Sequence, residues 1–248
     1  MTNLISPKII FTDDQLLVLN KPAGWLTHPS GRSDTPSVTE WLIVNDPSLA
    51  IIGPAEKLQD GTIIARAGIL HRLDRETSGV LAVAKTAEAF DWFTTSFRER
   101  TVAKIYRAIV LGVVKSDEGV IDLPIGRSRK DPRRRVASKR AVGTLRPAVT
   151  RFRVIERFTQ HTYLELKPET GRAHQLRAHL KAIQHPILAD ELYASSRPAN
   201  LGSALPTINR TALHAYSLTL PFPNGEKKYF EALLPEDFSQ TLDYLCQP

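Results

Sequence analysis

The sequence predicts an α+β protein, because candidate strands and candidate helices follow one another irregularly along the chain. Short runs of β-branched and apolar residues predict the strands, and apolar residues spaced three or four apart predict the helices. A regular alternation of strand and helix would instead predict a parallel barrel. The 248 residues, 42% of them hydrophobic, can bury a sizeable core as one domain or as two closely fused lobes.

The N-terminal part of the chain predicts a strand pair, a short helix, a buried strand and a longer helix. Asp13-Asp14 forms the turn of the strand pair, Pro36 opens the short helix, and Thr86 caps the longer one. These assignments rest on residues 8–11 and 16–19 for the strand pair, Val38, Trp41 and Leu42 for the short helix, residues 80–84 for the buried strand, and Phe90, Phe93 and Phe97 for a core-facing aromatic stripe.

The C-terminal part predicts further strands, a helix, a hairpin and a last helix. The helix begins at Ala173, with Leu176, Leu180 and Ile183 toward the core. Asn224-Gly225 marks the turn of the hairpin, and Pro235 opens the last helix. The strands cover residues 103–111, 149–155, 163–166, 213–220 and 228–233.

A basic segment is the strongest compositional anomaly of the chain. The formal net charge is +7, which makes a polyanion a plausible partner without identifying it. Residues 127–140 hold eight Lys or Arg against one Asp, including Arg133, Arg134 and Arg135. Such a segment is usually only a solvated face, but here it lies between two strand-like segments. We therefore expect an exposed loop that grips phosphates and becomes ordered when nucleic acid binds.

Several protein classes lack their usual signals in this sequence. Cys246 is the only cysteine, so the chain has no internal disulfide, and a reducing cytoplasm fits. No run of eighteen apolar residues indicates a membrane span. The sequence also contains no P-loop, no dinucleotide-binding glycine motif and no serine nucleophile elbow.

The central motif runs from His71 to Gly79 and leads into the apolar run 80–84, with Asp74 at the turn between loop and strand. An Asp in this setting can serve only as a turn or cap residue. The pattern H-R-L-D-x-x-T-S-G, however, resembles the signature of the RluA-type pseudouridine synthases. In that family the Asp is the catalytic nucleophile, and the resemblance implies this role for Asp74.

Two further motifs and one turn extend the resemblance to most of the chain. Lys104-x-Tyr106-x-Ala108 is similar to the second family motif, whose Tyr stacks on the target base. Residues 170–179, T-G-R-x-H-Q-L-R-x-H, resemble the third motif, whose second Arg pairs with the catalytic Asp and maps onto Arg177. Lys21 lies in an N-K-P-x-G turn that borders the active site in the family, although a turn lysine is more often simply solvated.

The resemblance implies a fold, an activity and a set of RNA contacts. The fold is a mixed, mostly antiparallel central β-sheet in two fused lobes, with flanking helices and a central RNA-binding cleft. The activity is isomerisation of uridine to pseudouridine in ribosomal or transfer RNA, with the target base flipped out and no cofactor or metal required. The sequence leaves open whether Asp74 attacks C1′, adds to C6 or promotes a glycal. The expected RNA contacts are His71, Arg72, Lys21, Arg172, Leu176, Arg133, Arg134 and Arg135.

Arg72 has two interpretations. The resemblance suggests that it occupies the place vacated by the flipped base, while a surface salt bridge to Glu76 or a neighbour is the alternative. For His174 and His179, five positions apart on the predicted helix, we expect a satisfied polar edge and no metal site.

The organisation expected from the resemblance is a single catalytic domain, residues 1–248, that acts as a monomer in the cytoplasm. Many relatives carry an additional N-terminal RNA-binding module of the S4 type, and we expect none here. One rival function is a non-catalytic RNA-binding protein of the same fold. Another is a nuclease that uses Asp74, His71 and a metal, which would show a second clustered carboxylate, and only Glu76 is near.

Overall fold

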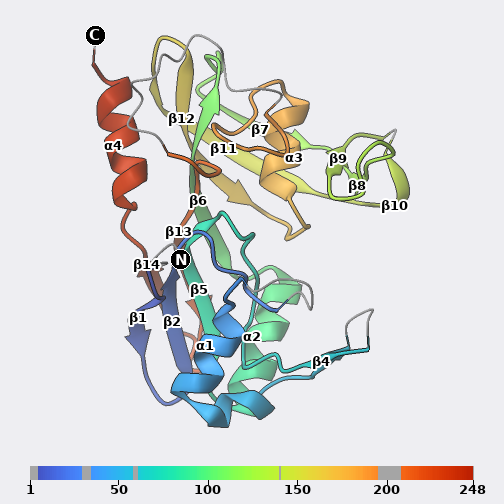
Figure 1. Cartoon of the computed structure of the whole chain (residues 1–248), viewed down its shortest axis with the longest axis vertical. Coiled ribbons are helices and arrows are strands. Elements are labelled where there is room, and N and C mark those ends of the chain that lie inside the picture. Colours follow the sequence, from blue (N-terminus) through green and yellow to red (C-terminus); the bar gives the residue numbers. More distant parts are fainter. Residues whose placement is uncertain (1–4, 30–34, 58–60, 140, 195–207, 248) are drawn as a thin grey trace. The chain divides into compact units, whose positions relative to one another are not determined.

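The computed structural model describes residues 5–29, 35–57, 61–139, 141–194 and 208–247, and the chain divides into two compact units (Figure 1). Unit 1 consists of Met1–Ala103 and Ala215–Leu233, and unit 2 consists of Lys104–His214 and Leu234–Pro248. Neither unit is continuous in sequence. Each consists of a long segment and a shorter one that comes later in the chain. Arg140, the last residue of the basic segment, lies outside the described residues.

Unit 1 is built on a sheet in the order β1, β2, β5, β13, with β14 paired to β13. The pairs β1–β2, β2–β5 and β13–β14 are antiparallel. The predicted strand pair around Asp13-Asp14 and the predicted hairpin at Asn224-Gly225 are both confirmed. The strands are β1 (Lys8–Thr12), β2 (Leu16–Lys21), β5 (Ser78–Ala84), β13 (Leu213–Pro221, in this unit from Ala215) and β14 (Lys227–Glu231).

Two helices of unit 1 begin at side-chain caps. Thr86 accepts a hydrogen bond from the N–H of Ala89, which confirms it as the cap of α2 (Ala87–Glu99). Ser37 caps α1 (Val38–Asn45) in a capping box with Glu40, so Pro36 precedes the cap and does not lie in the first turn as predicted. Phe90 and Phe93 pack in the core against β2 and β5, with Phe97 at its edge, as predicted.

Unit 1 also contains three short elements that the sequence did not predict. They are the 3₁₀ helix η1 (Pro47–Ile51) and the two-residue strands β3 (Glu56–Lys57) and β4 (Ile63–Ile64), which pair with each other. Elements this short carry no periodic pattern that a sequence can reveal.

Unit 2 is built on the antiparallel sheet β6, β12, β11, β7. It confirms the predicted strands 103–111, 149–155 and 163–166, and it adds β7, which the sequence did not predict. Its strands are β6 (Ala103–Leu111, in this unit from Lys104), β7 (Glu118–Asp122), β11 (Val149–Arg157) and β12 (His161–Pro168). These three pairings are antiparallel, like β1–β2, β2–β5 and β13–β14 of unit 1. The predicted α+β class with a mixed, mostly antiparallel sheet is therefore confirmed.

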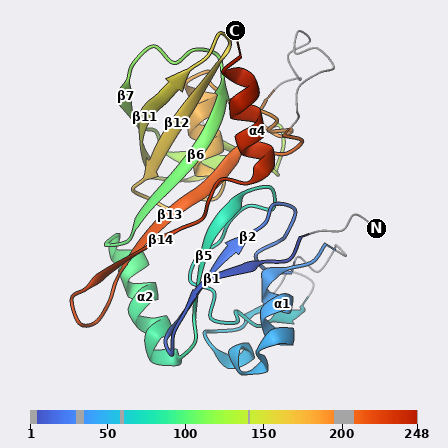
Figure 2. The same cartoon turned by 90° about the vertical axis from the view of Figure 1, so that its left-hand side faces the viewer.

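The helices α3 (Gln175–Ala182) and α4 (Glu236–Leu245) cover opposite faces of the unit 2 sheet (Figure 2). Phe238 of α4 packs against Tyr163, whereas Gln175 of α3 contacts Thr150, whose side chain lies on the other face. The helix α3 starts two residues later than predicted, because His174 adopts a left-handed conformation with φ of 53°. Pro235 precedes α4 as its N-cap, as the sequence indicated.

The basic segment is more ordered than we expected. Three strands, β8 (Ile125–Arg127), β9 (Arg135–Ala137) and β10 (Val142–Arg146), form a small sheet in the order β10, β8, β9. Ile125 and Ala137 are buried and pack with Ala178 of α3. The prediction of an exposed loop was therefore wrong at the ends of the segment, where a few apolar residues suffice to anchor strands. Only the turn 128–134 projects as a loop, and we call β8, this turn and β9 the basic hairpin.

No helix in the part of the chain that the structure describes is long and apolar enough to cross a membrane.

Candidate functional site

The residues that the sequence singled out are divided between the two units. Unit 1 carries Lys21, His71, Arg72 and Asp74, and unit 2 carries Tyr106, Arg172, Leu176, Arg177 and the basic hairpin. Each group is described below within its own unit.

The backbone on both sides of Asp74 is held by hydrogen bonds from the segment 21–27. The hydroxyl of Thr27 donates to the carbonyl oxygen of Leu73 at 2.8 Å and accepts from the Leu73 N–H at 3.1 Å. On the other side, the carbonyl oxygen of Arg75 accepts from the N–H of Gly24 at 2.9 Å. Asp74 itself is half-buried, and its own carbonyl oxygen accepts from the Thr77 N–H. The loop therefore presents this carboxylate from a fixed backbone position.

Lys21 is part of the same support and is not a solvated turn residue. Its side chain is 0% exposed at the end of β2. The ammonium donates to the carbonyl oxygens of Pro22 at 3.0 Å, Trp25 at 2.8 Å and Arg75 at 3.1 Å. The expectation that Lys21 contacts RNA is thus replaced by a structural role beside Asp74, because its three donors are directed at the backbone.

His71 connects the Asp74 loop to the central strand of unit 1. Its Nε2 accepts a hydrogen bond from the N–H of Ala82 in β5 at 3.1 Å, so this nitrogen carries a lone pair and no proton. The imidazole ring stacks on Phe97 of α2, with ring centroids 5.1 Å apart. These contacts direct one face and one nitrogen of the ring toward the protein interior.

Arg72 is exposed, and the alternative salt bridge to Glu76 is not formed. Glu76 instead pairs with Arg75, with Nε and Oε1 2.7 Å apart. Within the residues that the structure describes, Arg72 makes no ion pair. Burial, and then the positive charges of Arg66 and Arg72, lower the pKa of nearby His28 to about 4. Arg66 and Arg72 therefore lie close enough to His28 for their charges to act on it.

In unit 2, the sheet register places Tyr106 on the face that α3 covers. Tyr106 pairs with Leu166, which in turn pairs with Phe152 of β11. Thr150 lies two residues from Phe152 on the same face, and it contacts Gln175 and His179 of α3. Tyr106 and the helix that carries Arg177 therefore occupy one face of the sheet. The tyrosine ring is half-buried against the core of unit 2.

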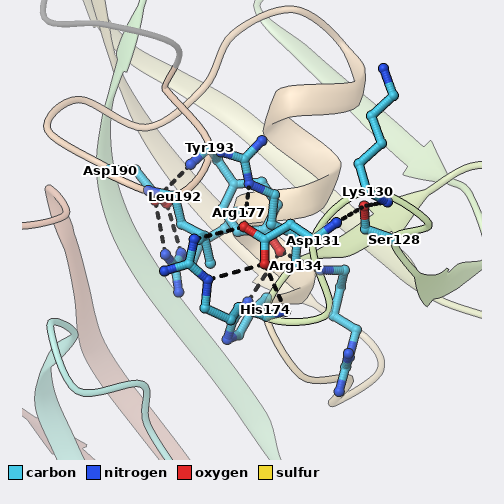
Figure 3. Close-up of polar contacts among 11 residues, drawn as sticks. Ser128, Lys130, Asp131, Arg134, His174, Arg177, Asp190, Leu192 and Tyr193 are labelled. Carbon is cyan, nitrogen blue, oxygen red and sulfur yellow. Dashed lines mark hydrogen bonds and ion pairs between the residues drawn. The ribbon is translucent and has the colours of Figure 1, made fainter.

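Arg177 has a partner that the sequence did not reveal. Its Nε and Nη2 donate to the Asp190 carboxylate at 2.7 and 2.8 Å, a bidentate ion pair with a fully buried Asp190 (Figure 3). The ring of Tyr193 lies 5.0 Å from the guanidinium carbon. Asp190 and Tyr193 gave no sequence signal, since a pair 13 residues apart across a loop follows no periodic spacing. The predicted pairing of Arg177 with Asp74 joins the two units and stays a prediction.

The other predicted contacts on this motif have roles within the protein. Arg172 donates from Nε to the carbonyl oxygen of Pro147 at 3.2 Å. Leu176 is only 6% exposed and belongs to the core, so it offers RNA almost no surface. His179 is fully buried, with hydrogen bonds to Thr150 and to the carbonyl oxygen of Leu123, instead of forming a polar edge.

The basic hairpin exposes only part of its charge. Arg133 and Arg134 are 76% and 46% exposed, and both pair with the carboxylate of Asp131. Hydrogen bonds from Arg133 lower the pKa of Asp131 to about 2, so this carboxylate is ionised at neutral pH. Arg135 is half-buried, and its N–H donates to the hydroxyl of Tyr193 at 2.7 Å. The three arginines are therefore not equivalent, and Arg135 is anchored at the base of the hairpin.

Comparisons with known proteins agree with this arrangement. A family model described as RNA pseudouridylate synthase matches residues 15–182. Ribosomal large subunit pseudouridine synthase D of Neisseria meningitidis serogroup B is 38% identical over 242 residues, which cover 96% of this chain and 60% of the relative. The protein of the same name from Nitrosomonas europaea is 39% identical over 237 residues, which cover 95% and 64%. The chain thus spans less than two thirds of the length of these relatives.

Two solved structures have a similar fold. The human protein titled RNA Pseudouridylate Synthase Domain Containing 1 superimposes with a TM-score of 0.71 at 25% identity, over 96% of this chain and 87% of the human chain. The human protein titled RNA Pseudouridylate Synthase Domain Containing 4 gives a TM-score of 0.70 at 28% identity, over 96% and 92%.

Proposed function

Since this chain belongs to the RNA pseudouridylate synthase family, we propose that it isomerises uridine in RNA to pseudouridine, with Asp74 as the nucleophile. The reaction breaks the bond from ribose C1′ to uracil N1 and joins C1′ to C5, with no net redox change. The observation that carries the proposal is the fixed backbone around Asp74, which Thr27 holds at Leu73 and which Gly24 and Lys21 hold at Arg75. A nucleophile on a backbone fixed in this way starts its attack from a defined position.

The remaining groups bind and orient the flipped nucleotide in this proposal. Tyr106 stacks on the uracil ring, a contact worth roughly 1–3 kcal/mol. Arg177 supplies a permanent positive charge in a planar guanidinium that orients the Asp74 carboxylate. Arg72, exposed and without an ion pair among the described residues, occupies the space that the flipped base vacates.

The proposed substrate is ribosomal RNA of the large subunit, because this is what the names of the two bacterial relatives above state. Transfer RNA, which the sequence also allowed, is the alternative. Arg129, Lys130, Arg133 and Arg134 of the basic hairpin provide phosphate contacts. Action as a monomer in the cytoplasm, without a cofactor or metal, completes the proposal.

The test is release of tritium from RNA labelled at uracil C5, prepared from cells that lack this protein. Wild type and Asp74→Asn are assayed side by side in EDTA, with RNA affinity measured in parallel. We expect release by the wild type only and similar RNA affinity for both proteins. Release by Asp74→Asn would remove Asp74 from its role. RNA cleavage that EDTA abolishes, without tritium release, would favour a nuclease. RNA binding by both without release would favour the non-catalytic RNA-binding protein.

A further inference from the structure

Tyr193 lies beside the Arg177 side chain (Figure 3) and also contacts Arg135, the first residue of β9. Its ring is 5.0 Å from the guanidinium carbon, and its hydroxyl accepts the Arg135 N–H at 2.7 Å. The same hydroxyl is 3.1 Å from Nδ1 of His174, the residue that precedes α3. Tyr193 is almost fully buried, so its ring orientation is fixed by packing. One side chain therefore contacts both Arg177 and the base of the basic hairpin.

Asp190 fixes the other side of this arrangement. Its Oδ1 accepts hydrogen bonds from the N–H groups of Leu192 at 3.0 Å and Tyr193 at 3.1 Å, in addition to the bond from Arg177. The carboxylate that orients the guanidinium is thus bonded to the backbone of Tyr193. Asp190 and Tyr193 therefore belong to one hydrogen-bonded network that contacts Arg177.

The position of Arg177 in α3 shows why it needs such support. It is the third residue of the helix, and no acidic residue lies in the first turn. A positive charge near a helix N-terminus is unfavourable, because the helix dipole places partial positive charge there. The buried Asp190 carboxylate compensates for both the dipole and the loss of water around the guanidinium.

We propose that Asp190 and Tyr193 are positioning residues that hold the Arg177 guanidinium in one orientation. The Tyr193 hydroxyl, through its hydrogen bond to Arg135, fixes the position of the guanidinium relative to the basic hairpin. This inference rests on the proposed function, in which Arg177 acts at the reacting carboxylate and the hairpin holds RNA. RNA bound by the hairpin would then be held at a fixed position relative to the guanidinium.

The first test is Tyr193→Phe, which keeps the ring over Arg177 and removes the hydroxyl. We expect kcat for tritium release to fall about 3- to 10-fold, the size of one lost hydrogen bond, while KM for RNA stays within about twofold. A purely structural role would lower the folded fraction and leave the kcat of folded protein unchanged. That result would overturn the inference.

The second test combines Tyr193→Phe with Arg177→Lys. If Tyr193 acts through Arg177, adding Tyr193→Phe to Arg177→Lys lowers kcat by less than it does in the wild type. Additive losses would show that Tyr193 acts by another route and would contradict the proposal.

The third test compares two bidentate ion pairs of the same geometry, whose acidic side chains are 0% exposed in Asp190 and 37% exposed in Asp237. Asp190→Asn keeps an oxygen for the Leu192 and Tyr193 N–H groups but loses the charge, and we expect kcat to fall more than about 10-fold. Asp237 forms the same bidentate pair with Arg210, at 2.7 and 2.9 Å, also within unit 2. Asp237→Asn is therefore the control and should leave kcat unchanged. Equal kcat values in the two variants would overturn the assignment of Asp190.

A readout without turnover separates this inference from the proposed function. In the wild type we expect the Arg177 Nε–H to give a sharp, slowly exchanging NMR signal, and in Tyr193→Phe a signal that exchanges at least about threefold faster. An unchanged exchange rate would overturn the positioning role. If the exchange rates of the two proteins differ in this way but the wild type releases no tritium, only the proposed function is contradicted.

Discussion

The Lys21 ammonium donates three hydrogen bonds to backbone carbonyl oxygens, and one of them belongs to Arg75, next to Asp74. A buried lysine with three such acceptors acts as a cross-link between two loops. It ties the turn after β2 to the loop before β5, and these loops are more than fifty residues apart in sequence. The position of the proposed nucleophile therefore depends on a residue that does not react.

Lys21→Met tests this dependence. The substitution keeps the volume but removes three hydrogen bonds to backbone carbonyl oxygens, one of them fully buried, so we expect the free energy of unfolding to fall by about 2–4 kcal/mol. Urea denaturation measures this loss, and tritium release by the folded protein should also decrease. The control is Lys57→Met, at an exposed position in β3, where the change should stay within about 0.5 kcal/mol. An unaltered denaturation midpoint for Lys21→Met would contradict the cross-link.

His28 gives the stability a predictable pH dependence. Burial and two nearby arginines lower its pKa in the folded protein from 6.5 to about 4. The unfolded chain therefore binds a proton at this residue between pH 6.5 and 4 while the folded protein does not, and stability falls as the pH decreases through this window. We expect this residue to account for about 2 kcal/mol of that loss, allowing for partial solvent exposure.

The measurement for His28 is a difference between two proteins. Urea denaturation at pH 7.5 and pH 4.5 should show a smaller loss of stability in His28→Gln than in the wild type, since glutamine does not titrate. Burial also lowers the pKa values of His161 and His179, so part of the acid sensitivity should remain. Equal acid sensitivity in both proteins would contradict the assignment to His28.

Among the secondary-structure elements, the basic hairpin presents its charge in a restrained form. Asp131 pairs with both Arg133 and Arg134, and it also accepts a hydrogen bond from the Arg133 N–H. An ionised carboxylate beside two arginines reduces the number of cations that are available to phosphates. The ion pairs with Asp131 thus order the turn, and they also lower its affinity for a polyanion.

Asp131→Asn should separate these two effects. Asparagine keeps an oxygen that can accept from the Arg133 N–H, but it releases Arg133 and Arg134 from the ion pairs. We expect tighter RNA binding and a steeper dependence of log K on log salt, with the slope increasing in magnitude by about 1 for each additional phosphate that the released arginines bind. Affinity measured between about 50 and 200 mM salt provides the slope.

The control for this variant changes the net charge by the same amount elsewhere. Asp91 is exposed on α2 in unit 1, and Asp91→Asn should change the salt slope much less. Equal slopes for the two variants would show that net charge alone determines RNA affinity and that the hairpin has no special part.

The accuracy of prediction from the sequence differs between elements for physical reasons. Strands such as β6 and β11, and the helices capped by Thr86 and preceded by Pro235, have periodic or capping signals that local sequence determines. The basic hairpin lacks such a signal, since two buried apolar residues at its ends outweigh a run of charges between them. The start of α3 was missed because His174 adopts a left-handed backbone that its residue type does not demand.

The same contrast holds for the candidate site. Asp74, Tyr106 and Arg177 lie in three motifs that are local in sequence, so a resemblance could identify each of them. Asp190 acts through contacts that only the folded chain creates, and no spacing rule points to it. The turn motif singled out Lys21, but its hydrogen bonds to the backbone beside Asp74 appear only in the folded chain. Residues that react are therefore easier to recognise from sequence than residues that hold them in place.

For the whole molecule, the division into two units places Asp74 in one and Tyr106 and Arg177 in the other. The proposed reaction thus requires both units to be folded, although each has its own core. Unit 2 in turn depends on the C-terminal segment, because α4 covers one face of its sheet. A loss of stability at α4 should therefore be separable from a loss of chemistry.

Phe238→Ala makes this separation measurable. Phe238 is fully buried in the core of unit 2 and packs against Tyr163, on the face of the sheet opposite to α3. Truncation leaves a cavity, and we expect the free energy of unfolding to fall by about 3–5 kcal/mol. At temperatures well below the unfolding transition, kcat for tritium release should stay within about twofold of the wild type, because Phe238 and Tyr106 lie on opposite faces of the sheet. The control Asp243→Ala, at an exposed position on the same helix, should change stability by less than about 0.5 kcal/mol. A large decrease in kcat for folded Phe238→Ala would mean that α4 influences the reacting groups through the sheet, and packing and chemistry would then not be separate in this protein.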